Sequence, residues 1–383
     1  MTLVQISEPS VRTGAALDVA LVGCVDDSPA SRHLGSLAAA LSARGHDVTV
    51  YTREDEHTAR VLDGHGYRVQ AVDLDGDVLA SSGEWAGKLS DVWQQAAPDV
   101  VHAYGWLPGV AAQLAARRHQ LPTVQTFHNL ASPIGTGSRG RMETVLARGA
   151  TWATAGSTAD LDLLSRLRRN RSRVSLVPAG VDADRFATAN AADELEQLCR
   201  IACFAPGATL FDEVSRVLRA LPALGGGSRL VVGATGPADP DEPWKALRQL
   251  AADLGMTHLV TFLGHVSADD IAQVLRSVDV LVCTPAESSD PAVALAAMAS
   301  GVAVVAGDVG ALSDVVIHEV TGFLVPGNDR RDLMLALKTL QAETFRRQGM
   351  GAAGRTRARS RYSWDRIAVD VESAYRQVVP API

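Results

Sequence analysis

The stretch "CTPAESSDPAVALAAMASGVAVVAG", from Cys283 to Gly307, contains the pattern on which the fold prediction depends. An apolar run ends at Cys283, a polar turn follows, and an alanine-rich segment leads to Ser300-Gly301 and a second apolar run. Short apolar runs bounded by Gly and Pro are typical of buried strands, and the segment between them has the composition of a helix. The stretch therefore predicts a strand, a helix and a second parallel strand joined by a right-handed crossover.

The same alternation continues on both sides of this stretch. Toward the amino terminus, "LDVALVG" at residues 17–23 predicts a buried strand, and the leucines of residues 31–44 recur at helical spacing before Gly45. Two successive sets of such patterns predict an α/β fold with two doubly wound, Rossmann-like domains. The other strand patterns are "HDVTVYTR", "PDVVHAY", "PTVQTFH", "RVSLVPAGVD", "RIACFAPG", "SRLVVGATG", "LVTFLGHV", "VDVLVCTP", "GVAVVAGD" and "TGFLVPGND".

The length of 383 residues suits two domains rather than one hydrophobic core. A polar segment without periodicity, from Asp184 to Ala192, predicts the linker between them. The last helix pattern begins after Ser363, a residue type that favours the N-cap position. The expected division is a flexible N-terminus at 1–16, an N-terminal Rossmann-like domain at 17–185, a C-terminal Rossmann-like domain at 186–361 and a C-terminal helix at 362–383.

The composition limits the possible functions. A formal net charge of −7 gives no reason to expect nucleic acid as a partner. The four cysteines lack paired metal-ligand spacing, and isolated reduced cysteines fit a cytoplasmic location. The apolar run of residues 292–306 is interrupted by Ser300-Gly301 and is too short to cross a bilayer as one helix. The arginines of residues 166–173 form either a solvated surface or a basic face, so membrane contact is at most peripheral.

Several blocks of the sequence carry a family resemblance when they are taken in order. They include "SLAAALSARGHDVTVYTR", "VSLVPAGVDADRF", "LVTFLGHVSADDIAQVLRSVDVLVCTP", "ALAAMASGVAVVAGDVGALSDVVIHEVTGFLVP" and "GRTRARSRYSWDRIA". These blocks resemble the retaining glycosyltransferases of family 4, which have the GT-B fold, with two Rossmann-like domains facing a cleft. The resemblance implies transfer of a hexosyl group from a UDP- or GDP-linked sugar, with retention and with no cofactor or metal. It also implies that the last helix crosses back to the N-terminal domain.

The resemblance places the nucleotide-sugar donor on the second domain. The family uses an Arg and a Lys after the first strand of that domain to stabilise the leaving diphosphate. Phe204 and Thr209 occupy those positions in this sequence, and Ser288 and Ala296 align with the family's two glutamates. Carboxylates close to Ser288 are the first candidates to replace them. The expected donor-binding residues are Thr209, Gly264, His265, Glu287, Ser288 and Asp290.

The catalytic candidate by resemblance is His128, which ends the strand "PTVQTFH". In the family this histidine contacts the sugar or its leaving phosphate; a loop histidine with local hydrogen bonds is the alternative. Ser28, with Pro29, replaces an early Gly-Gly turn of the family and loses a backbone donor at the proline. We place Ser28 on the acceptor side of the cleft.

The remaining acceptor-side candidates follow one strand and one turn. His102, Tyr104 and Trp106 lie at the carboxyl end of a predicted strand, where open α/β sheets bind ligands. The alternative for these three is aromatic packing beneath a helix start. Gly180 belongs to "VPAGVD", which predicts a turn on the linker side of the cleft, and a simple turn glycine is its alternative.

Two functions of different classes follow from this pattern. The first is an active glycosyltransferase that uses a nucleotide-diphosphate sugar. The second is a catalytically inactive pseudo-glycosyltransferase that binds and supports an active glycosyltransferase partner. The changes at Phe204, Thr209, Ser288 and Ala296 are the reason to keep the second, because they remove charged groups from the expected donor site.

Overall fold

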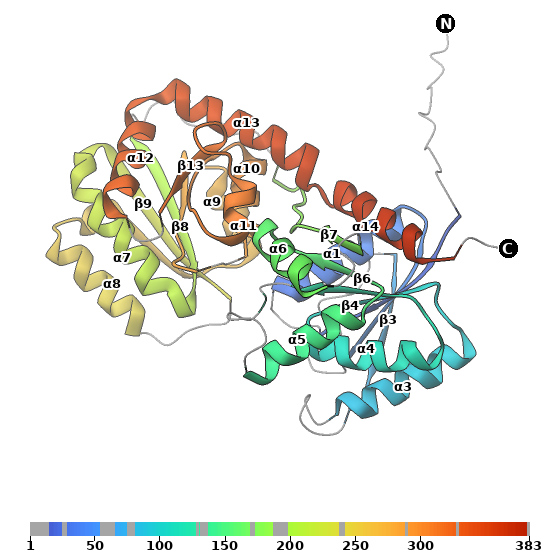
Figure 1. Ribbon diagram of the computed structural model, residues 1–383. Coiled ribbons are helices and arrows are strands. Elements are labelled where there is room, and N and C mark those ends of the chain that lie inside the picture. Colours follow the sequence, from blue (N-terminus) through green and yellow to red (C-terminus); the bar gives the residue numbers. More distant parts are fainter. Residues whose placement is uncertain are drawn as a thin grey trace, which may run out of the picture.

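The computed structural model of the protein describes residues 15–24, 29–53, 66–74, 81–127, 130, 137–168, 173–186, 198–236, 242–287, 290–326 and 329–380. It consists of two α/β lobes, and the red helices at the end of the chain run from one lobe to the other (Figure 1). Two Rossmann-like domains are therefore confirmed. Residues 1–14 of the expected flexible N-terminus lie outside the described residues.

The first lobe is built on a seven-stranded sheet with the order β3-β2-β1-β4-β5-β6-β7. Every described pairing in it is parallel. The chain moves outward from β1 in one direction and then restarts at β4 in the other, so the sheet has its switch point between β1 and β4. The strands are β1 (Asp18–Val22), β2 (Asp47–Arg53), β3 (Arg68–Val72), β4 (Val100–Tyr104), β5 (Thr123–Phe127), β6 (Trp152–Ala155) and β7 (Val174–Leu176).

Helices cover both faces of this sheet because central strands such as β1 and β4 carry buried apolar side chains on both sides. One face packs against helices from opposite ends of the chain, since Leu34, Leu37 and Leu41 share a buried cluster with Ile367 and Val371. The other face is covered by the remaining helices of the lobe. The helices are α1 (Pro29–Ala43), α3 (Ser82–Gln95), α4 (Trp106–Arg118), α5 (Gly137–Gly149), α6 (Thr158–Leu167) and, from the end of the chain, α14 (Trp364–Val378).

The second lobe has a six-stranded parallel sheet with the order β10-β9-β8-β11-β12-β13. Its switch point lies between β8 and β11, because the chain moves outward from β8 and returns to the other side of it at β11. The strands are β8 (Cys199–Pro206), β9 (Ser228–Thr235), β10 (Val260–His265), β11 (Val280–Cys283), β12 (Ala303–Gly307) and β13 (Gly322–Val325).

The opening stretch of the sequence forms β11, α10 and β12, as predicted. α10 ends at Gly301, whose φ of 79° is the left-handed conformation that favours glycine after a helix. Its alanines allow close packing against the long helix α13. The helices and 3-10 turns of this lobe are η2 (Gly207–Thr209), α7 (Leu210–Ala220), η3 (Leu221–Gly227), α8 (Glu242–Asp253), η4 (Thr257–Leu259), α9 (Ala268–Leu275), α10 (Ala292–Ser300), α11 (Gly310–Val315), α12 (Arg330–Ala342) and α13 (Thr344–Tyr362).

α14 joins the end of the second lobe to the core of the first. The Tyr375 hydroxyl is 2.7 Å from Nδ1 of His102, and Nε2 of His102 is 2.6 Å from the Thr126 hydroxyl. His102 is fully buried within β4. The predicted cap at Ser363 is confirmed, because its side chain accepts a hydrogen bond from the backbone N–H of Arg366. A helix of the second half of the chain is thus part of the first core.

Two strands were missing from the sequence prediction. β3 is an edge strand with four exposed residues, and its sequence "RVQAV" lacks the continuous apolar character of a buried parallel strand. β6 has only four residues, "WATA", and contains no Val or Ile. Both strands are held by pairing with neighbouring strands, which a local pattern does not reveal.

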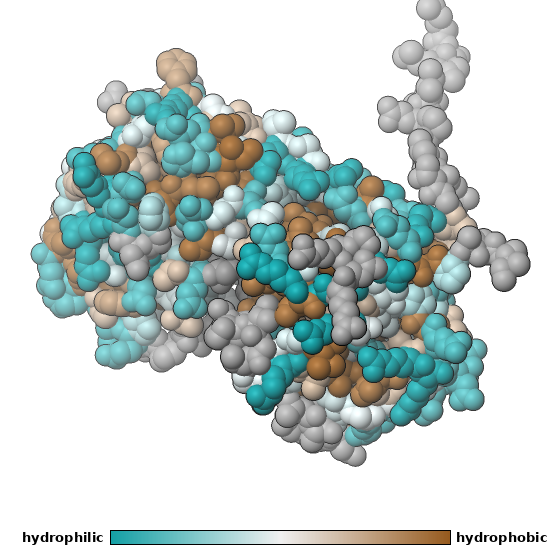
Figure 2. All heavy atoms as spheres, viewed as in Figure 1, coloured by the Kyte–Doolittle hydropathy of each residue, from teal (hydrophilic) through white to brown (hydrophobic). Residues whose placement is uncertain are grey.

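Polar side chains cover most of the face of both lobes shown in Figure 2, and apolar side chains appear between them in smaller groups. Among the described helices, none combines the length and the apolar character needed to cross a bilayer. The arginine cluster is not uniformly solvated. Arg168 is buried and donates hydrogen bonds to the backbone carbonyls of Ala147, Ala150 and Thr151, while residues 169–172 lie outside the described residues.

Replacing Tyr375 with Phe should destabilise the first lobe. The substitution leaves Nδ1 of the buried His102 without its partner, which costs about 1–3 kcal/mol of unfolding free energy. Differential scanning calorimetry should show a lower melting temperature for Tyr375→Phe. Tyr67→Phe removes a hydroxyl from a half-buried tyrosine outside the His102 contact and is the control. Equal melting temperatures for the two variants would contradict this role of the His102–Tyr375 contact.

Candidate functional site

The candidate site lies where the carboxyl-terminal edges of the two sheets approach each other. Arg32, near the start of α1, forms an ion pair with Asp290, whose other oxygen accepts a hydrogen bond from the first backbone N–H of α10. α1 follows β1 and α10 follows β11, so this contact joins the loops beside both switch points. Open α/β sheets bind ligands at such points, and here the two points face each other.

A second contact between the lobes lies beside the first. The Asp314 carboxylate of α11 accepts hydrogen bonds from both the backbone N–H and the hydroxyl of Thr158, at 2.7 and 2.5 Å. Thr158 is the first residue of α6, where a carboxylate also interacts favourably with the helix dipole. α13 supports α11 from behind, because Arg357 and the Tyr362 hydroxyl donate to the Asp314 backbone carbonyl.

The loop after β8 is where the family resemblance predicts donor binding. Phe204 is buried, with 3% of its surface exposed, so an apolar ring lies at the position where the resemblance predicts an arginine. Thr209 is exposed at the end of η2 and donates a hydrogen bond to Oε1 of Glu213 at 2.8 Å. This loop therefore offers hydroxyl and backbone donors, with no Arg or Lys among residues 204–209.

Glu213 was not identified from the sequence, although it lies beside the switch point. It belongs to the first turn of α7, and only 2% of its surface is exposed. Burial raises its pKa, while hydrogen bonds from the Thr209 hydroxyl and the Thr284 backbone N–H and the charge of Arg216 oppose that rise. Acidic residues are common in the first turn of a helix, and only the structure shows that the side chain of Glu213 is buried.

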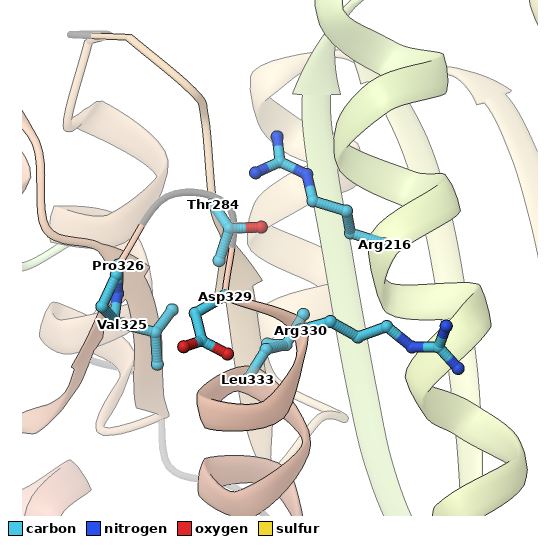
Figure 3. A pocket seen from close by; sticks show the side chains of 7 residues that line it. All are labelled: Arg216, Thr284, Val325, Pro326, Asp329, Arg330 and Leu333. Atoms are coloured by element: carbon cyan, nitrogen blue, oxygen red, sulfur yellow. The ribbon is translucent and has the colours of Figure 1, made fainter.

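A small pocket lies next to Glu213, between α7, the end of β11 and the start of α12 (Figure 3). It is partly open to solvent, and its cavity volume of about 10 Å³ is close to the space that one water molecule needs. The Thr284 hydroxyl points toward α7 and Arg216, and it is buried without a hydrogen-bond partner among the described residues. The Arg330 guanidinium extends from α12 away from the pocket. The lining residues are Arg216, Thr284, Val325, Pro326, Asp329, Arg330 and Leu333.

The other predicted donor residues are spread along the edge of the second sheet. Glu287 is exposed in the loop after β11, and Asp290 binds Arg32. Gly264, with a φ of 80°, and the exposed His265 end β10, which lies two strands away from β8. The structure therefore brings Thr209 and the loop of Glu287 to the switch point, with Gly264 and His265 at the far end of the same edge.

Two predicted acceptor-side residues are inside the first lobe. His102 has no exposed surface and both ring nitrogens are hydrogen-bonded, and Tyr104 is 3% exposed. Burial also raises the pKa of the Tyr104 hydroxyl well above its usual range. This burial favours the packing alternative for both rings, and their contact with an acceptor stays a prediction. Trp106 is half-buried at the start of α4 and remains at the edge of the sheet.

Gly180 has a packing role that its turn sequence did not reveal. A Cβ atom at this position would lie 2.6 Å from the Trp364 ring, so only glycine permits the close approach. Trp364 in turn packs against His33, and His33 packs against Tyr104. Gly180 thus contributes to the junction of the two lobes. Its predicted contact with an acceptor stays a prediction.

Three predicted residues lie outside the part of the chain that the structure describes. They are Ser28, His128 and Ser288. Of the described residues, β5 ends at Phe127, at the same edge of its sheet as the switch point. Among the described residues, no cluster of His, Cys, Asp or Glu could hold a metal ion.

The chain is similar to known glycosyltransferases along most of its length. A sequence profile described as Glycosyltransferase Family 4 matches residues 30–185, and one described as Glycosyl transferases group 1 matches residues 205–343. A D-inositol 3-phosphate glycosyltransferase from Xylanimonas cellulosilytica is 31% identical, with 89% of each chain covered. The same-named protein from Stackebrandtia nassauensis is 30% identical over 73% of this chain and 68% of its own length.

Solved structures with the same fold share less sequence. The Anabaena HepE protein in complex with UDP has a TM-score of 0.81 at 19% identity, covering 94% of this chain and 100% of that one. The complex of HepE with UDP-glucose has a TM-score of 0.76 at 20% identity, covering 94% of this chain and 100% of that one. At this level of identity the similarity shows the fold.

Replacing Asp314 with Ala should loosen the contact between the lobes. The variant removes the acceptor of both Thr158 hydrogen bonds, so the backbone amide of Thr158 should exchange with solvent several-fold faster. Hydrogen exchange read by mass spectrometry measures this effect. Asp308→Ala is the control, because Asp308 accepts a hydrogen bond from Ser313 within its own lobe. An unchanged exchange rate at Thr158 in Asp314→Ala would exclude this contact as a clamp.

Proposed function

Because the chain belongs to the GT-B glycosyltransferases of family 4, we propose that it transfers a hexosyl group from a nucleotide-diphosphate sugar to an acceptor with retention of configuration. The observation that carries this proposal is the switch point between β8 and β11, which faces the first lobe across the Arg32–Asp290 contact. A donor bound there would have its sugar directed at the first lobe, where an acceptor can approach.

The donor in this proposal is linked to UDP or GDP. The complexes of HepE with UDP and UDP-glucose support this choice, since that protein shares the fold. The diphosphate would lie between Thr209 and the loop of Glu287 and Ser288. Gly264 and His265 would lie toward the base, and Asp290 toward the sugar. His128 is proposed to contact the sugar or its leaving phosphate.

The proposed donor site has fewer charged contacts than its family pattern requires. A hydrogen bond to a charged group is worth about 1.5–3 kcal/mol, and each 1.4 kcal/mol changes a binding constant about tenfold. With Phe204 and Thr209 in place of two basic residues, donor binding should be weaker by about two decades or more. The proposed enzyme is therefore one that binds its donor weakly and turns it over slowly.

A second function, a scaffold for an active glycosyltransferase, is favoured by the same residues. Phe204 is buried, Ala296 lies in the buried part of α10, and Glu213 adds a carboxylate next to the expected diphosphate. A protein of this kind would bind its partner without turning over a donor. Co-purification of this chain with an intact glycosyltransferase whose activity depends on it, together with no turnover by the chain alone, would select this second function.

Calorimetric titration and a turnover assay test the proposal directly. We expect UDP- or GDP-linked sugars to bind in the millimolar range, with slow release of the nucleotide when an acceptor is added. D-inositol 3-phosphate, named for the Xylanimonas relative, is the first acceptor to test. Absence of binding and turnover with all the donors would exclude the proposed enzyme.

Replacing Thr209 with Lys should improve donor binding about tenfold, because it adds one charge-assisted contact near the diphosphate. Thr356→Lys places the same charge on an exposed position of α13 and controls for net charge. Titration calorimetry with UDP measures both. If Thr356→Lys and Thr209→Lys raise the affinity equally, the loop after β8 is not where the diphosphate binds.

A further inference from the structure

The carboxylate of Glu213 lies between the two loops that flank the switch point of the second sheet. Its Oε1 accepts from the Thr209 hydroxyl, which follows β8, and it also accepts from the backbone N–H of Thr284, which follows β11. With 2% of its surface exposed, it is one of few buried acids among the described residues. The carboxylate therefore binds donors from both strand ends at which a diphosphate is proposed to bind.

The hydrogen-bond donors beside Glu213 are of the kind that bind phosphates. Hydroxyl groups and backbone N–H groups at strand and helix ends are common ligands of phosphate oxygens. Here Thr209 and Thr284 already donate to a carboxylate of this chain. The Thr284 hydroxyl, in contrast, is buried and has no partner in the described part of the chain. At the switch point, two hydrogen-bond donors are thus bound to an internal acid, and the Thr284 hydroxyl has no partner among the described residues.

Burial affects the pKa of the Glu213 carboxyl group more than the charges around it do. On α7, Arg216 lowers its pKa and Asp212 raises it, and burial raises it more than any other cause. The thiols of Cys203 on β8 and Cys283 after β11 have pKa values far above neutrality because they are buried, so they add no charge at pH 7. α12 presents Asp329 and Arg330 around the adjacent pocket, and Asp329 is held by the backbone N–H groups of its own helix.

We propose that Glu213 controls occupancy of the donor site, so that a nucleotide diphosphate binds there with uptake of one proton by the Glu213 carboxylate. This inference rests on the proposed function and adds its regulation by pH. The proton comes from solvent, and no covalent bond to the donor forms or breaks in the step.

Charge repulsion and hydrogen bonding favour the protonated form once a diphosphate is present. Two like charges close together in a site with little water repel each other strongly. Protonation of one of them has the lower free energy. A protonated carboxyl group also gains an O–H donor, which can bind a phosphate oxygen. The same residue changes from a competitor for the hydrogen-bond donors into a donor itself.

The sign of the pH dependence follows from linkage. The pKa of Glu213 is already raised in the free protein and rises further in the complex. Affinity is therefore highest below the pKa of the free protein, falls as the pH rises between the two pKa values, and becomes constant above the second. One linked proton limits the fall to about tenfold per pH unit.

The test is titration calorimetry with UDP-glucose and GDP-mannose, whose diphosphates do not titrate near neutrality. Wild-type protein and Glu213→Gln are compared from pH 5.5 to 8 in buffers of different ionisation enthalpy. The buffer dependence of the heat gives the number of protons taken up. We expect up to one proton for the wild type and none for Glu213→Gln, which should bind several-fold more tightly than the wild type at pH 8.

Two further variants make the result specific. Glu143→Gln removes another buried glutamate, in α5 of the first lobe, and should keep the pH dependence of the wild type. Thr209→Val removes a hydrogen bond that lowers the pKa of Glu213, so its loss of affinity should begin at a higher pH. This second readout does not depend on Glu213→Gln being folded.

The outcomes separate this inference from the proposed function. Binding with the same pH profile in the wild type and Glu213→Gln, or with no proton uptake by the wild type, overturns the inference and leaves the proposed function intact. Absence of binding of either nucleotide sugar by all the variants at every pH overturns both.

Discussion

The packing of α14, the last helix of the chain, in the core of the first lobe determines how the two halves of the protein meet. Its apolar side chains share a buried cluster with the first lobe and its Tyr375 hydroxyl contacts His102, while α13, directly before it, packs on the second lobe. The junction is reinforced where the backbone N–H of Val181 donates to the carbonyl of Tyr362. Since α13 also supports α11, the Asp314–Thr158 contact is held from the same helix. The facing edges of the two sheets, and hence the site between them, depend on this arrangement.

The proposed donor side of that site has an unusual charge pattern for binding an anion. Its loops provide hydroxyl and backbone donors, an aromatic ring fills the position of Phe204, and the buried charged group nearest the switch point is the acid Glu213. A cationic site would attract a diphosphate at any pH. A site in which a buried acid lies beside Arg216 and several neutral donors attracts a diphosphate best when the acid is neutral, so weak binding and proton dependence have the same physical origin.

Much of the fold could be predicted from the sequence, and much less of the site. Buried parallel strands such as β1, β4 and β11 are continuous apolar runs, and the N-cap at Ser363 is local chemistry, so both were accessible. The roles of residues that depend on partners far away in the sequence could not be predicted in this way. The sequence around Gly180 does not indicate its contact with the Trp364 ring, and the sequence around His102 does not indicate its hydrogen bond with Tyr375. Glu213 has the sequence context of an ordinary helix start, and only the structure places it beside Thr209 and Thr284. The lobe contacts of Arg32 and Asp314 join residues more than 150 positions apart.

A crystal structure of the protein with UDP at low pH would show whether Glu213 lies at the diphosphate. We expect the diphosphate between the loop of residues 206–209 and the loop after β11, with the Glu213 carboxyl group within hydrogen-bond distance of a phosphate oxygen. A diphosphate bound elsewhere, or one bound at this point while Glu213 keeps only its hydrogen bonds to Thr209 and Thr284, would contradict it.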